Sequence, residues 1–102
     1  MKPSVSHHEV LMKYLKDPLE ACEYLNAALK EGDHKHFLIA LRNVAEAKGG
    51  LLALSRRLKM NRGHLYRILS GDGNPKIESL QQILRAFGMD LAIVPQKPRK
   101  AA

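Results

Sequence analysis

The sequence is poor in cysteine and in aromatic residues. Among 102 residues there is one cysteine, Cys22, together with three tyrosines, two phenylalanines and no tryptophan. A lone cysteine excludes an intrachain disulfide and does not suggest a cysteine-based metal site, so a reducing cytoplasm suits the chain. No apolar run approaches the roughly 18 residues of a membrane span, and the N-terminus lacks the apolar segment of a signal peptide. We therefore expect a cytoplasmic protein with no membrane partner.

Acidic residues are also absent from a long stretch in the middle of the chain. None lies between Glu46 and Asp72, and we call residues 47–71 the acid-free window. Residues 1–33 contain four lysines against six acidic residues, a net charge of −2, whereas residues 34–102 contain thirteen basic against four acidic residues, a net charge of +9. This asymmetry favours a polyanion as the partner of the larger part. The alternative is a basic surface that only aids solubility.

The length suits a single domain, and hydrophobic periodicity predicts an all-α fold. Val10, Leu11, Tyr14 and Leu15 indicate one or two helical turns. Asp17 then caps a helix that has Pro18 at its first position and Glu20 at its third. Gly32 is expected to end this helix. Its apolar stripe comprises Leu19, Ala21, Cys22, Leu25, Ala28 and Leu29.

Four more helices follow, which gives five in total. Asp33 opens one whose inward face holds Phe37, Leu38, Leu41, Val44 and Ala45, and the others are expected over about 51–58, 62–70 and 77–87. Their predicted core positions are Leu51, Leu54, Leu58, Leu65, Ile68, Leu69, Ile77, Leu80, Ile83, Leu84 and Phe87. Residues 91–94 would form an edge strand only with a partner strand. We expect a flexible leader at 1–8, one domain at 9–95 and a flexible basic tail at 96–102.

Residues 51–71 carry the strongest functional signal. Two short helical patterns meet across a turn at 59–61, where Met60 is expected to insert into the core. On a helical wheel of 62–70, Leu65, Ile68 and Leu69 lie on one side, while the opposite side and flanks are polar or cationic. Two short helices joined by a tight turn, the second of them cationic, are typical of helix-turn-helix DNA binding.

This motif assigns candidate DNA contacts. Arginine suits the paired acceptors of guanine, so Arg62 and Arg67 are expected to read bases, helped by Asn61 and His64. Contacts to the DNA backbone are expected from Arg56, Arg57, Lys59, Gly63, Tyr66, Asn74, Lys76 and the helix-start amides near Leu51. Gly63 has no side chain and is expected to permit close backbone approach.

With these residues identified, a family resemblance becomes clear. Residues 51–88 resemble the Cro-type (lambda-repressor-like) helix-turn-helix, a five-helix DNA-binding fold. More narrowly, the chain is similar to the probable addiction-module antidote family, the HigA-like antitoxins, over about residues 14–94. The segments that carry this likeness are YLKDPLEACEYLNAALKEGD, FLIALRNVAEAKGG, HLYRILSGDGNP and LQQILRAFGMDLAIV.

The resemblance implies an antitoxin. Such a protein binds a small mRNA-cleaving or ribosome-associated toxin and represses its own operon through the second helix of the motif, here 62–70. The chain departs from the pattern at Lys59, where the motif usually has glycine, and at Gly63, where an acidic or polar residue is common. A homodimer that reads a palindromic operator is expected, with residues 84–95 as the dimer contact.

Other readings stay open or are disfavoured. A stand-alone phage-type repressor without a toxin, and a protein-interaction adaptor that never touches DNA, remain alternatives. Residues 9–31, with Glu20, Glu23 and Glu31, either meet the toxin or only complete the core. The spacing of the five histidines does not favour a metal site, and no arrangement of residues suggests an enzyme or a cofactor.

Overall fold

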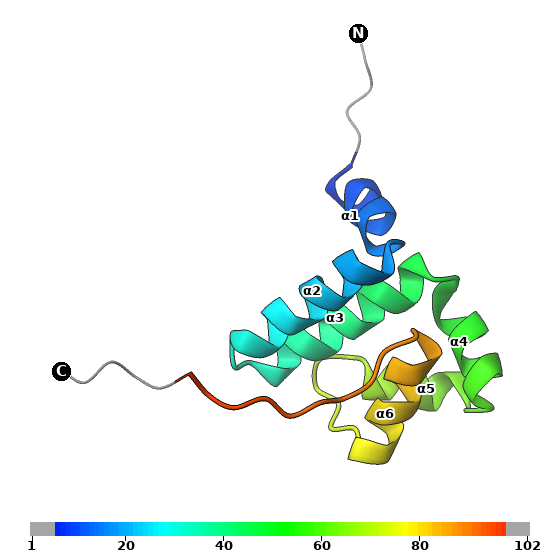
Figure 1. Ribbon diagram of the computed structural model, residues 1–102. Coiled ribbons are helices and arrows are strands. Elements are labelled where there is room, and N and C mark those ends of the chain that lie inside the picture. The colour runs from blue at the N-terminus through cyan, green and yellow to red at the C-terminus, as the bar shows by residue number, and fades with distance from the viewer. Residues whose placement is uncertain (1–5, 98–102) are drawn as a thin grey trace, which may run out of the picture.

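The structure is a computed structural model that describes residues 6–97. Within that range it contains six α-helices and no strand, which confirms the all-α prediction (Figure 1). No helix of this part of the chain is long and apolar enough to cross a membrane. The helices are α1 (His7–Leu15), α2 (Pro18–Lys30), α3 (His34–Ala47), α4 (Gly50–Leu58), α5 (Arg62–Ile68) and α6 (Ile77–Ala86).

The sixth helix is α1, where the sequence predicted only one or two turns. The Ser6 side chain accepts a hydrogen bond of 3.1 Å from the Glu9 amide and so caps a full nine-residue helix. His7 and His8 are therefore helical, although they fall in the predicted leader 1–8. The rest of that leader, residues 1–5, and residues 98–102 of the predicted tail lie outside the described residues.

The residues predicted to cap the starts of three helices form those caps in the structure. Asp17 accepts hydrogen bonds from the amides of Leu19 and Glu20 at 2.8 and 3.2 Å, with Pro18 at the first helical position. Asp33 accepts from the Lys35 amide at 2.9 Å, and Asn61 caps α5. Each cap satisfies amides that would otherwise lack a partner and contributes about 1 kcal/mol.

The core is built around α3. Figure 1 shows α2 and α3 side by side, with α1 crossing near the end where α3 leads into α4, and with α4, α5 and α6 below the pair. The inward face predicted for α3 is confirmed, since Phe37, Leu38, Leu41, Val44 and Ala45 are all buried. The side chains that complete this cluster from the other helices and the turns after them are Leu15, Ala21, Leu25, Leu51, Leu54, Leu65, Ile68, Leu69, Ile83, Leu84 and Phe87.

Some predicted core positions are wrong. Leu19 is 76% exposed, Leu29 is 49% exposed and Ile77 is 71% exposed, while Cys22 is half-buried. Leu19 and Ile77 lie in the first turns of α2 and α6, and Leu29 lies in the last turn of α2. Residues at helix ends have fewer neighbouring helices to cover them, so a stripe that is continuous in sequence is buried only in its middle.

The predicted edge strand at 91–94 is absent. Residues 91–97, which we call the C-terminal arm, have neither helix nor strand. Figure 1 shows the arm leaving the end of α6 as an extended path. A single short strand needs a partner, and the described part of this chain offers none.

Candidate nucleic-acid interface

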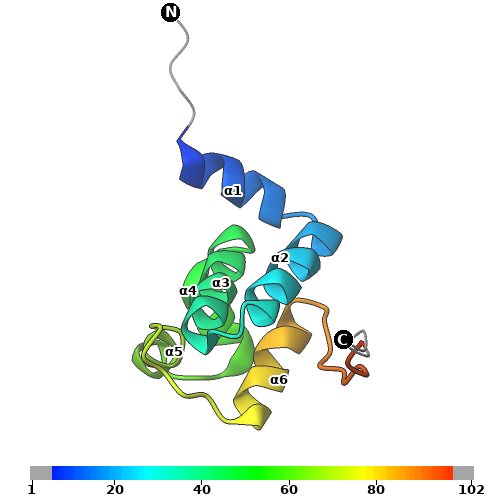
Figure 2. The ribbon, with the colours of Figure 1, turned by 90° about the vertical axis from the view of Figure 1, so that its left-hand side faces the viewer.

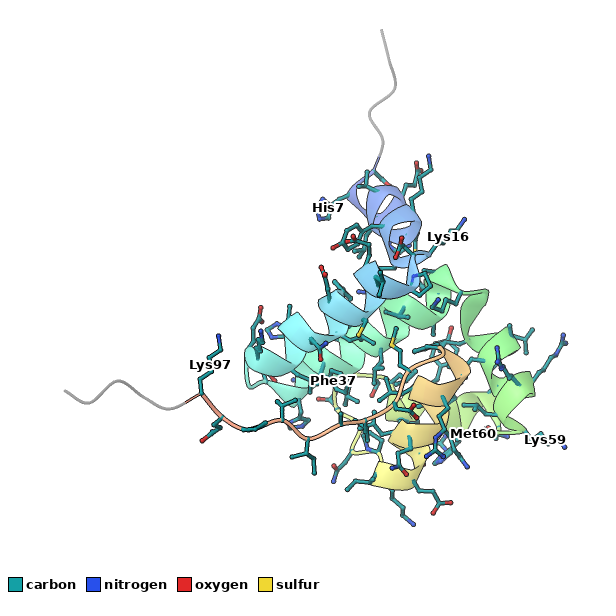
Figure 3. All side chains as sticks on the ribbon, viewed as in Figure 1. His7, Lys16, Phe37, Lys59, Met60 and Lys97 are labelled. Carbon is teal, nitrogen blue, oxygen red and sulfur yellow. The ribbon has the colours of Figure 1, made fainter. Side chains whose placement is uncertain are left out.

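A tight turn joins α4 to α5. Lys59 ends α4 with φ 54° and ψ 42°, which is the left-handed region. Its amide donates to the Arg56 carbonyl at 3.2 Å, and the Met60 amide donates to the Ser55 carbonyl at 2.9 Å. Met60 packs against the core, as predicted. Lys59 is exposed, and Figure 3 shows it at the outer edge of the molecule beyond α4.

The burial pattern predicted for the second helix of the motif is confirmed. Leu65 and Leu69 are fully buried and Ile68 is 7% exposed, so these three side chains anchor α5 to the body. The helix is shorter than the predicted 62–70, because Leu69 already leaves helical geometry and forms the C-cap. Figure 2 shows α5 at the outer edge of the molecule, on the side opposite the C-terminal arm. The exposed positions along it are Asn61, Arg62, Gly63, His64, Tyr66, Arg67 and Ser70.

The cations of this region have no ionic partner among residues 6–97. The ion pairs in that range, with N···O distances of at most 4.0 Å, involve other basic side chains such as Lys35 and Arg85. The positive charge is therefore not neutralised by the protein's own described carboxylates. The cations concerned are Arg56, Arg57, Lys59, Arg62 and Arg67, all exposed.

Tyr66 holds arginines beside α5. The Arg62 guanidinium lies 6.0 Å from the centre of its ring, and the Arg42 guanidinium lies 5.3 Å from it. Such cation–π contacts are worth about 0.5–1 kcal/mol at exposed sites and restrict the arginine side chains. Sequence reasoning missed Arg42 because it lies on α3, outside the acid-free window, and only the fold brings it to Tyr66.

Asn61 and Gly63 act together at the start of α5. The Asn61 Oδ1 accepts a hydrogen bond from the His64 amide at 3.1 Å, so only the Nδ2 group remains free to donate to a ligand. A Cβ added at Gly63 would lie 3.2 Å from that Oδ1. The glycine therefore leaves room for the cap, whereas a Cβ here would require the Asn61 side chain to shift by a few tenths of an ångström.

The remaining predicted backbone contacts flank α5. His64, Asn74 and Lys76 line one groove, so the structure brings these predicted residues together. The same groove is also lined by Ile68, Pro75, Glu78 and Ser79. The Leu51 side chain is buried, which leaves only its amide for a contact. That amide lies in the first turn of α4, whose N-cap Gly49 provides no side-chain hydrogen bond.

Gly73 allows the loop after α5 to pass close to the end of that helix. A Cβ at this position would lie 2.6 Å from the Arg67 carbonyl oxygen and closer still to the Ile68 carbonyl oxygen. Both contacts are shorter than real Cβ contacts allow. Only glycine fits here without movement of the backbone, and this packing places Asn74 and Lys76 beside His64.

The α1–α2 corner has a different character. A hydrogen bond with Glu20, together with the negative charges of Glu20, Glu23 and Asp17, raises the pKa of Tyr14 above its ordinary value. Tyr14 and Val10 are 43% and 54% exposed. An exposed apolar and acidic surface therefore lies on α1 and α2. Figure 1 places α1 at the opposite end of the molecule from α5.

The histidines do not gather. His7 and His8 lie on α1, His34 and His36 on α3, and His64 on α5. His36 instead lies near carboxylates of its own turn, 3.3 Å from Asp33 and 3.6 Å from Glu31. The described residues contain no group of three or more potential ligands placed for a metal ion.

Comparison with known proteins identifies a family. Residues 5–95 match the family described as "Probable addiction module antidote protein". The chain is also 30% identical over 70 residues to an uncharacterized protein of Haemophilus influenzae, an alignment that covers 69% of this chain and 71% of that relative. No solved structure matches the chain. Because the family match spans every helix of the structure, the chain belongs to the probable addiction module antidote family.

Proposed function

We propose that this protein is a HigA-like antitoxin that binds operator DNA through α5 and represses the operon encoding itself and its toxin. The antidote family supports a toxin partner. The observation that best supports DNA binding is that the side chains of Arg62 and Arg67 are exposed and, within residues 6–97, unpaired. Both are exposed on a helix anchored by Leu65 and Ile68, and neither pairs with a carboxylate among the described residues.

In this proposal α4, the turn and α5 form a Cro-type helix-turn-helix within a lambda-repressor-like domain. The exposed side of α5 enters the major groove, where Arg62 and Arg67 donate to guanine O6 and N7 and Asn61 and His64 assist. A bidentate arginine–guanine pair provides about 1–3 kcal/mol of discrimination.

Phosphate contacts on both sides of α5 would hold it in register. Arg56, Arg57 and Lys59 precede it, and the groove that His64 shares with Asn74 and Lys76 follows it. These contacts carry no sequence information, but they make the affinity depend on salt concentration. Tyr66 restricts the Arg62 side chain, one of the two proposed base readers, and holds Arg42 of α3 beside the helix.

The protein acts as a homodimer on a palindromic operator in this account. Two copies of α5 must reach successive major grooves, about 34–36 Å apart. The toxin is a small protein that acts on RNA and is therefore expected to be basic, because RNA is a polyanion. The acidic α1–α2 corner around Glu20 and Glu23 is distant from α5, so a toxin bound there would leave α5 free for DNA.

The test is an anisotropy titration of a labelled duplex from the promoter upstream of the gene, with excess non-specific DNA present. Arg67→Ala should weaken binding by about 5- to 150-fold, which corresponds to 1–3 kcal/mol. Lys16→Ala is the matched control, because it removes one positive charge at the α1–α2 junction (Figure 3) and should change the affinity little. Wild-type affinity of Arg67→Ala, with unchanged helical content, would contradict the assignment.

A second measurement separates the antitoxin from a stand-alone repressor. The product of the neighbouring reading frame should co-purify with this protein and lose its toxicity in its presence. Operator binding without any such partner would instead favour a phage-type repressor. A protein that neither binds the operator nor neutralises a toxin would favour the third alternative, a protein-interaction adaptor that does not touch DNA.

A further inference from the structure

The C-terminal arm exposes apolar side chains to water. Ile93 is 100% exposed, Val94 is 76% exposed and Leu91 is 39% exposed. The arm runs away from the helices, with Lys97 at its far end (Figures 1 and 3). Adjacent aliphatic side chains exposed in this way are typical of a surface that binds another protein.

The same chain carries an open apolar groove. It lies where the α2–α3 turn approaches the start of α6 and has a volume of about 290 Å³. No residue of the C-terminal arm lines it. Its apolar lining comprises Leu29, Phe37, Leu38, Pro75 and Leu80, and its polar edge comprises His34 and Asn74. The exposed Ile77 lies one turn before Leu80 on α6.

We infer that the arm of one copy docks in this groove of a second copy, and that the second arm docks reciprocally. The exchange is isologous, because a twofold axis relates the two copies and each copy uses the same two surfaces. Both arms are buried and both grooves are occupied, so neither an arm nor a groove remains to bind a third copy. The seven residues of the arm can span about 20 Å, which is enough to cross between two bodies. This inference rests on the proposed function, because a palindromic operator requires a dimer.

The groove also adjoins the DNA-binding side. Asn74 and Pro75 line this groove and the groove shared with His64 and Lys76. An arm seated in the groove would therefore restrain the loop that presents Asn74 and Lys76. Dimer formation and phosphate contact are thus coupled through one short segment.

A disulfide-trapping experiment tests docking between copies. In a Cys22→Ala background, Leu29→Cys and Ile93→Cys are made in separate chains, mixed in equal amounts and oxidised. A cross-linked dimer should form in the mixture far more than in either variant alone. The control pairs Ile93→Cys with Val10→Cys, which is equally accessible but lies on α1 and should not cross-link. No more cross-linked dimer in the mixture than in either variant alone, or than in the Val10→Cys control, overturns the inference.

Sedimentation of the full chain provides the second test. Ile93→Asp should raise the dissociation constant of the dimer at least about tenfold, because a carboxylate would enter an apolar groove without a partner. Val10→Asp should leave the dimer unchanged. A wild-type chain that sediments as a monomer, or an Ile93→Asp chain that dimerises normally, refutes arm exchange.

The two proposals fail in distinguishable ways. Arg67→Ala should remain a dimer and lose operator binding. Ile93→Asp should lose the dimer and retain weak contact with a half-site. Normal operator binding by a monomeric wild-type protein would contradict the arm exchange and leave the role of α5 intact.

Discussion

Replacement of Lys59 by glycine should make the protein more stable and weaken its binding to DNA. Lys59 has φ 54°, the only positive φ among the non-glycine residues of the described chain. A side chain with a Cβ pays about 1–2 kcal/mol for this conformation, and glycine avoids that strain. Glycine also gives the unfolded chain more conformational freedom, and this entropy cost cancels about 0.5–1 kcal/mol of the relieved strain.

The net gain in the free energy of unfolding is therefore about 0.5–1 kcal/mol. For a domain of this size, that gain corresponds to a rise in Tm of about 2–8 °C. The lost ammonium group has the opposite effect on DNA. If Lys59 contacts a phosphate, the slope of log K against log salt concentration should decrease in magnitude by about 0.9.

Thermal unfolding followed by circular dichroism measures the first effect, and anisotropy titrations at several salt concentrations measure the second. Lys59→Gln is the matched control, since it removes the charge and keeps the left-handed strain. It should show the same decrease in the salt slope, about 0.9, without any gain in Tm. A Lys59→Gly protein that melts at or below the wild-type temperature would refute the argument for the turn, and an unchanged salt slope would refute the phosphate contact.

Three further substitutions test the elements that support α5. Gly73→Ala should destabilise the fold by about 1–3 kcal/mol in urea unfolding, because the new Cβ meets the Arg67 and Ile68 carbonyl oxygens; unchanged stability would show that the loop is not tightly packed. Leu65→Ala should cost about 2–5 kcal/mol in the same assay, since Leu65 is fully buried, and a cost below 1 kcal/mol would contradict its role as the anchor. Asp17→Ala should lower stability by about 1 kcal/mol through the lost cap of α2, whereas Asp17→Asn should lose much less.

Local chemistry made much of the fold predictable. Asp17, Asp33 and Asn61 each place a short acceptor at a helix start, and a cap of this kind depends only on the next three residues. The inward face of α3 was predictable because a long central helix repeats its apolar residues at the helical period. The anchoring of α5 through Leu65, Ile68 and Leu69 followed from the same rule.

Features that depend on neighbouring elements were not predictable. Leu19 and Ile77 continue apolar patterns, but their exposure is decided by where adjacent helices end. The contact between Arg42 and Tyr66 joins α3 to α5 and leaves no spacing signal. The need for glycine at position 73 arises because the loop crosses the end of α5, which a turn-rich sequence does not specify.

The central claim is that the exposed side of α5 meets DNA. An NMR titration of the labelled protein with its promoter duplex tests it residue by residue. The largest shifts in amide resonances should occur at residues 61–67, with smaller shifts at Lys59, Asn74 and Lys76 and almost none on α1. Shifts concentrated on α1 and α2, with residues 61–67 unchanged, would contradict the account.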